Sequence, residues 1–139
     1  MKAIRIVCSA LIVLVMLVAT LSCAKLPEPE YAGSITESIL IGMNENDYAK
    51  FSEHFDDAME AAMPEAVFNQ TNTAIRGKIG DYVSKEFWKA GKEAGFTTVY
   101  YKTKFTQEPE VIAKVVFREI AGEVYVSGLW FDSPKLRQK

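Results

Sequence analysis

The sequence has 139 residues, of which 49% are hydrophobic and 24% are charged, and this fits one small domain. Its net charge of −2 is spread without a block of either sign, so the basic stripe that nucleic-acid binding requires is missing. Only two cysteines occur, Cys8 and Cys23, which excludes a disulfide framework for everything beyond residue 23.

The first 22 residues have the pattern of a secretory signal peptide: Lys2 and Arg5 precede the apolar run Ile6–Leu21. The end of this run, Leu21-Ser22-Cys23-Ala24, resembles the lipobox of bacterial and archaeal lipoprotein precursors. In that family the cysteine becomes the first residue after cleavage and carries lipid on its sulfur.

The resemblance implies that residues 1–22 are removed and that Cys23 is lipidated, which anchors an exported protein at the membrane of the cell envelope. Thr20 departs from the pattern, which prefers leucine three places before the cysteine. Two alternatives stay open: a plain secretory signal cut nearby, and an uncleaved anchor, since about 18 apolar residues can span a bilayer. Whether the lipid is of the bacterial or the archaeal type also stays open.

Cleavage before Cys23 leaves 117 residues, enough for one core but not for two. It removes Lys2 and Arg5, so 14 of the 16 basic residues remain against 18 acidic ones, and the net charge becomes about −4. This charge does not favour anionic lipid headgroups. Within residues 23–30 the alternation of prolines and acids predicts an extended tether that follows the lipidated cysteine.

Helical spacing of apolar residues predicts three helices at the start of the folded domain, residues 31–136. The first begins near Tyr31 and the third opens at Pro64-Glu65, in the place that proline favours. Asn46 or Asp47 can cap the short second helix. The residues that set the apolar spacing of the first two helices are Ile35, Ile39, Leu40 and Met43, then Tyr48, Phe51 and Phe55.

Alternation and β-branched or aromatic composition predict four strands after the helices. The segment Tyr82–Lys92 is read as the first strand, although residues 85–93 also tolerate a helix. The other three run from Phe96 to Phe105, from Val111 to Arg118 and from Val124 to Phe131, and their short connections imply an antiparallel meander. Gly128 inside the last strand predicts a bulge or bend that curls the sheet.

This order of elements is that of the cystatin-like cone of the nuclear-transport-factor-2-like (NTF2-like) superfamily, a curved four-stranded antiparallel sheet packed against three N-terminal helices. Two motifs resemble the narrower family catalogued as domain of unknown function 3887: Asn44-Glu45-Asn46-Asp47-Tyr48, and Ser127-Gly128-Leu129-Trp130-Phe131 followed by Ser133-Pro134. The resemblance spans about residues 35–136. Some relatives are lipoproteins and others precede hydrolase domains, and the family implies no catalytic residues.

The residues offer little catalytic chemistry. His54, the single histidine, has no carboxylate at helical spacing behind it, so it is interpreted as a solvated residue near a helix end. The acids at positions 53, 56, 57 and 60 lack the glycine turn of a calcium loop and are interpreted as a solvated acidic face. We therefore expect no catalytic residue, metal or cofactor.

The aromatic residues suggest a binding site instead. In a cone the concave sheet face and the helices enclose a cavity mouth, where aromatic side chains with polar tips can hold a small apolar ligand. The predicted pocket residues are Tyr82, Tyr100, Tyr101, Tyr125 and Trp130. The alternative is that these residues pack as core. Two inner rows are predicted, Val111/Ala113/Val115/Phe117 and Val124/Val126/Gly128/Trp130.

The sequence thus predicts a lipoprotein of the cell envelope whose domain binds a small ligand or a protein partner. The alternative function is an isomerase or dehydratase of small molecules on the same fold, for which Asp81 and Tyr82 are the nearest candidates for acid–base work. A homodimer is a further possibility, since an open sheet edge can pair with a second copy.

Overall fold

The computed structural model describes residues 25–139, so the predicted signal peptide and Cys23 lie outside the described part. Four helices come first: α1 (Glu30–Glu45), α2 (Tyr48–Ser52), α3 (Asp57–Ala62) and α4 (Glu65–Ile79). Four strands follow: β1 (Tyr82–Glu93), β2 (Phe96–Phe105), β3 (Glu108–Ile120) and β4 (Glu123–Asp132), and then α5 (Pro134–Arg137). The α+β class is confirmed, and the short α3 and α5 are additional to the expected helices.

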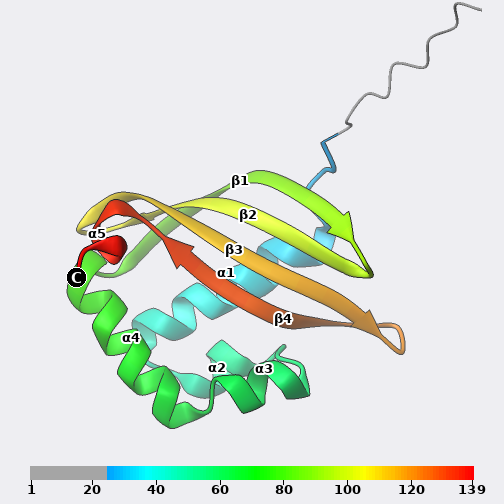
Figure 1. Ribbon diagram of the computed structural model, residues 1–139, viewed down its shortest axis with the longest axis horizontal. Coiled ribbons are helices and arrows are strands. Elements are labelled where there is room, and N and C mark those ends of the chain that lie inside the picture. Colours follow the sequence, from blue (N-terminus) through cyan, green and yellow to red (C-terminus); the bar gives the residue numbers. More distant parts are fainter. Residues whose placement is uncertain (1–24) are drawn as a thin grey trace, which may run out of the picture.

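The strands form one antiparallel sheet in the order β1-β2-β3-β4, the predicted meander (Figure 1). Two connections are two-residue turns, Ala94-Gly95 and Ala121-Gly122, in which all four residues have positive φ. The backbone of such a turn twists in the same sense as the paired strands, so two residues are enough to join neighbouring strands. The turn between β2 and β3 lies at Thr106-Gln107, so β3 begins at Glu108, three residues before the predicted start at Val111.

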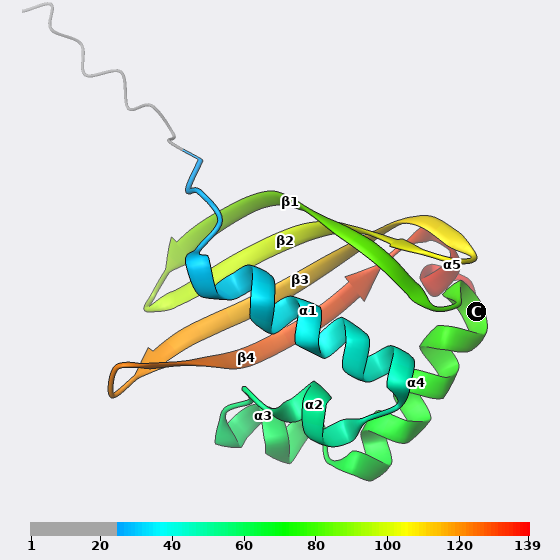
Figure 2. The same cartoon turned by 180° about the vertical axis from the view of Figure 1, so that it is seen from behind.

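The helices cover one face of the sheet. Figure 2 shows α1 crossing this face, with α4 at one end of α1 and α2 and α3 below the edge strand β4. The backbone of His54 and Asp56 pairs with Val126 on β4, through hydrogen bonds of 2.6 and 3.0 Å. This pairing covers part of the free edge of β4, where unpaired N–H and C=O groups would otherwise be exposed.

Local capping explains where the helices begin and end. The α1 helix ends at Asn46, whose φ of 53° is left-handed, as is common at helix C-termini. Asp47 and Asp56 then accept the Lys50 and Met59 N–H groups and so cap α2 and α3. Pro64 lies directly before the first residue of α4. Proline suits this place because its ring fixes φ and because an N–H group at the start of a helix would have no helical partner.

The core lies between the helices and the inner sheet face. Its wholly buried large side chains come from α1, α4 and strands β2 to β4: Ile39, Leu40, Phe68, Ile79, Val99, Tyr101, Phe105, Val111, Val115, Phe117 and Val126. The predicted inner row of β3 is confirmed, because Val111, Ala113, Val115 and Phe117 are all buried.

The predicted inner row of β4 is wrong beyond Val126. Phe117 pairs with Val126 but Val116 pairs with Gly128, so Ser127 is an extra residue in β4, the predicted bulge. Because side chains alternate with period two, this insertion exchanges the faces of everything after it. Leu129 and Phe131, opposite Val115 and Ala113, face the helices, whereas Gly128 and Trp130 lie on the outer face.

Gly128 is required by its neighbour Trp130. A Cβ atom at position 128 would lie 2.4 Å from the Trp130 ring, so the indole rests directly over the glycine backbone. A second bulge, between Phe87 and Lys89 on β1, places the extra residue Trp88 on the same outer face as Tyr100, whose ring it meets edge-on at 6.2 Å. The two bulges therefore decide on which face both tryptophans lie.

Candidate ligand-binding site

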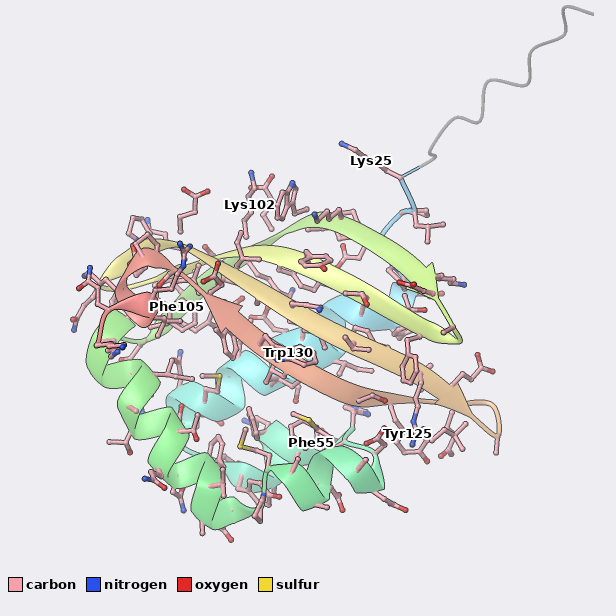
Figure 3. All side chains as sticks on the ribbon, viewed as in Figure 1. Lys25, Phe55, Lys102, Phe105, Tyr125 and Trp130 are labelled. Atoms are coloured by element: carbon pink, nitrogen blue, oxygen red, sulfur yellow. The ribbon has the colours of Figure 1, made fainter. Side chains whose placement is uncertain are left out.

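The structure does not bring the five predicted pocket residues together. Tyr82 and Tyr101 are buried in the core, while Tyr100 and Trp130 lie on the outer sheet face. Tyr125 lies near the β3–β4 turn, well away from Trp130 along the strand (Figure 3), and its hydroxyl donates to Glu123 at 2.6 Å. The predicted alternative, packing as core, holds for Tyr82 and Tyr101.

The two core tyrosines tie separate segments to the sheet through their hydroxyl groups. Tyr82 donates to Glu37 of α1 at 2.8 Å, and Tyr101 donates to Glu28 at 2.7 Å. In both residues burial and the hydrogen bond to a carboxylate raise the pKa of the phenol above its ordinary value. Both hydroxyls are therefore fixed donors in a structural role.

A pocket of about 250 Å³ lies instead where α4 meets the end of β4. Nine of its eleven lining residues are apolar. They come from α1, α2, α4, β4 and α5 and from the short link before α4. These residues are Met43, Phe51, Met63, Phe68, Ile75, Leu129, Trp130, Phe131 and Leu136. Thr71 and Asn72 complete the lining. We call this cavity the α4–β4 pocket. Trp130, which is 54% exposed, is the only predicted pocket residue that lines it.

Asn72 supplies the polar feature of the α4–β4 pocket. It is 2% exposed, and its Nδ2 donates to Met43 O and to Asn46 Oδ1, both at 2.9 Å, which holds α4 against the end of α1. Its Oδ1 accepts no hydrogen bond from any described residue. A buried acceptor without a donor is costly, and Asn72 is the one strongly buried polar side chain among the pocket residues.

The α4–β4 pocket has the composition of a binding site and lacks the groups of an acid–base enzyme. None of its eleven lining residues is an acid, a histidine, a lysine or an arginine. Asp81 is exposed and pairs with Arg76 at 2.6 Å, and Tyr82 is bound to Glu37. Among residues 25–139 no three His, Cys, Asp or Glu side chains are grouped to hold a metal ion.

A polar cluster at the β4 bulge is not predictable from the spacing of its residues. Asp56, read as part of a solvated face, is buried: its Oδ2 accepts the Ser127 hydroxyl at 2.6 Å and lies 2.8 Å from Arg118 Nε. Burial alone would raise the pKa of Asp56, but the Ser127 and Met59 hydrogen bonds and the Arg118 charge together lower it. The extra residue of the bulge supplies one of these partners, a contact that only the register reveals.

The Asn-x-x-Asp-Tyr motif is structural in each of its members. Asn44 exchanges two hydrogen bonds of 2.8 Å with the Tyr82 backbone, which fixes α1 to the start of β1. Asp47 caps α2, and the Tyr48 hydroxyl donates to Met63 O at 2.9 Å beside the α4–β4 pocket. The motif thus positions three elements around the sheet.

Comparison with known proteins agrees with this geometry. The model of the family described as "Protein of unknown function (DUF3887)" matches residues 36–122, which contain the motif and strands β1 to β3. The chain belongs to this family. No curated protein matches this DUF3887 chain.

A solved structure titled as a variant of Rd1NTF2_05, a designed NTF2-like protein, is similar to this DUF3887 chain with a TM-score of 0.51 and 16% identity. The similarity covers 76% of this chain and 100% of that one. It shows the NTF2-like fold. Within residues 25–139 no helix of this DUF3887 protein is long and apolar enough to span a bilayer.

Proposed function

We propose that this DUF3887 protein is a lipid-anchored module of the cell envelope that binds a small apolar ligand in the α4–β4 pocket. The observation that carries the proposal is the apolar lining of the pocket, in which nine of the eleven residues are apolar and the other two are Thr71 and Asn72. The volume of about 250 Å³ is just below the range of roughly 300–1,000 Å³ that is usual for ligand pockets. This size favours a compact, mainly apolar molecule of up to three rings.

Binding is favoured over catalysis because the lining has no group that can give or take a proton. An isomerase or dehydratase would need such a group within hydrogen-bond reach of its substrate. The proposal therefore assigns the pocket to recognition and storage, or to presentation of the ligand at the membrane.

The binding test uses N-phenyl-1-naphthylamine, an uncharged two-part aromatic probe with one N–H donor, whose fluorescence rises in apolar surroundings. We expect saturable binding to the wild type. Thr71→Phe, which places a ring in the pocket lining, should weaken binding about tenfold or more, equivalent to about 1.4 kcal/mol.

The matched control is Thr73→Phe, the same change two residues along α4 at an exposed position whose hydroxyl bonds only to Asn69 O. It should bind the probe as the wild type does. Equal effects of Thr71→Phe and Thr73→Phe, or no saturable binding at all, would contradict the pocket as the site.

The lipid anchor is tested at Cys23, which lies outside the described residues. The wild type expressed with its signal should enter the detergent-rich phase of a Triton X-114 separation, and Cys23→Ser should enter the aqueous phase. The reason is that an acylated cysteine adds hydrophobic chains that a serine cannot carry. Identical partitioning of the two proteins would remove the anchor from the proposal.

A further inference from the structure

The outer face of the sheet carries an unusual combination of side chains. Trp88 and Trp130 are 42% and 54% exposed there, with Tyr100 between them on β2. Lysines lie against these rings: Lys89 Nζ is 4.3 Å from the centre of Trp88 and 4.7 Å from that of Tyr100, and Lys114 Nζ is 4.7 Å from that of Trp130. We call this surface the Trp–Lys face.

The Trp–Lys face is basic although the protein is acidic as a whole. Lys102 and Lys104 on β2 add to Lys89 and Lys114, and none of the four forms a salt bridge with a described residue. Three acids share this face: Glu86 lies opposite Lys102, Glu110 lies near Lys102 and Lys104, and Asp132 pairs with Arg137, so the four lysines still leave a positive excess. The negative net charge of the whole chain disfavours anionic headgroups, but the local charge of the Trp–Lys face is positive and favours them.

The segment before α1 holds the domain close to residue 23. Glu28 accepts a hydrogen bond from the buried Tyr101, so the predicted tether is fixed to the domain five residues after Cys23. A chain of five residues spans at most about 17 Å. The tether leaves beside β1, the strand that carries Trp88 and Lys89, and Figure 1 shows this departure at the β1 edge.

We propose that the Trp–Lys face rests on the surface of an anionic lipid bilayer, with the tryptophans at headgroup level and the lysines on lipid phosphates. Tryptophan and tyrosine favour this interface because one end of each ring system is apolar and the other is wet. Lysine keeps its methylene groups on apolar surface while its ammonium reaches water or phosphate, and each basic residue near such a surface contributes about 1 kcal/mol. The inference rests on the lipid anchor proposed above.

The chain contains two tryptophans, Trp88 and Trp130, and both lie on this face, so tryptophan fluorescence reports on its contact with lipid. The lipidated protein is reconstituted into vesicles of phosphatidylcholine and phosphatidylglycerol with or without brominated acyl chains, which quench nearby indoles. We expect a blue-shifted emission and a drop of about twofold with brominated lipid, since interfacial residues reach roughly 5–10 Å into the headgroup boundary. Vesicles of phosphatidylcholine alone should give a smaller drop.

The test variant combines Lys89→Glu, Lys102→Glu and Lys114→Glu, and it should lose the quenching in anionic vesicles. The control carries the same charge change at three exposed lysines away from the face: Lys78→Glu, Lys135→Glu and Lys139→Glu. The control should be quenched like the wild type, and circular dichroism checks that both variants are folded.

The outcomes separate this inference from the anchor. A protein that floats with the vesicles but shows no quenching keeps its anchor, and the proposed orientation is then wrong. A protein that does not float with them overturns both. A tryptophan response to a soluble anionic polysaccharide, with none to vesicles, also overturns the bilayer as the partner.

Discussion

Replacing Phe117 by alanine is expected to lower the free energy of unfolding by about 3–5 kcal/mol, the largest loss among the substitutions considered. Phe117 is 0% exposed in the C-terminal half of β3, where its ring meets Tyr31 of α1 edge-on at 5.3 Å and its backbone pairs with Val126 beside the bulge. Truncation would leave a cavity between the sheet and α1 that these fixed elements cannot fill. Denaturant unfolding followed by circular dichroism measures the loss.

Because this loss is a large part of the stability of a small domain, Phe117→Leu provides a milder variant, with an expected loss of about 1–2 kcal/mol. The matched control is Val116→Ala, the next residue along β3, which points to the outer face and is half-buried. It should cost about 1 kcal/mol or less. A control loss as large as that of Phe117→Ala would mean that the inner and outer faces are wrongly assigned.

Asp56→Ala is expected to lower the free energy of unfolding by about 2–3 kcal/mol at neutral pH. The substitution removes the cap of α3, a contribution of about 1 kcal/mol, and leaves the Ser127 hydroxyl and Arg118 without their carboxylate. Arg118 is partly exposed, and solvent therefore screens its share of the loss. Asp57→Ala, the adjacent exposed acid in the first turn of α3, should change stability by about 0.5 kcal/mol.

The pH dependence of the free energy of unfolding separates the contribution of the Asp56 charge from that of the packing and hydrogen bonding of its side chain. Because the folded protein lowers the pKa of this carboxyl, its stabilisation is present above the unfolded value of about 4 and is lost as the pH falls below it. The stability difference between the wild type and Asp56→Asn should therefore be constant from neutral pH to about pH 5 and then narrow. A difference that stays the same down to pH 2 would show that the ionised form has no preferred partners.

Sequence patterning predicts most elements of this fold, because the apolar residues of α1 and of β3 each keep one period over the whole segment. The apolar stripe of α1, the alternation of β3 and the two-residue turn at Ala121-Gly122 each follow from local residue types. Even the ambiguous segment at residues 82–92 forms the expected strand. Its own spacing is equivocal, and its pairing with β2 along almost its whole length is what makes it a strand.

What the sequence could not predict is how the faces change along β1 and β4. Gly128 indicates a bulge, but its position relative to Phe117 fixes whether Leu129 or Trp130 faces the helices, and this register is a property of the paired strands. The same bulge brings Ser127 to Asp56. For this reason the predicted inner row of β4 contains Gly128 and Trp130 in place of Leu129 and Phe131, two residues that line the α4–β4 pocket.

Ligand binding in the α4–β4 pocket is the central proposal, and the methionines of the domain test it directly. Met43 and Met63 line the pocket, whereas Met59 is buried outside it. In protein labelled with ¹³C at the methionine methyl groups, N-phenyl-1-naphthylamine should shift the Met43 and Met63 resonances during titration and leave that of Met59 in place. Shifts of all three together, or of Met59 alone, would contradict a ligand site between α4 and β4.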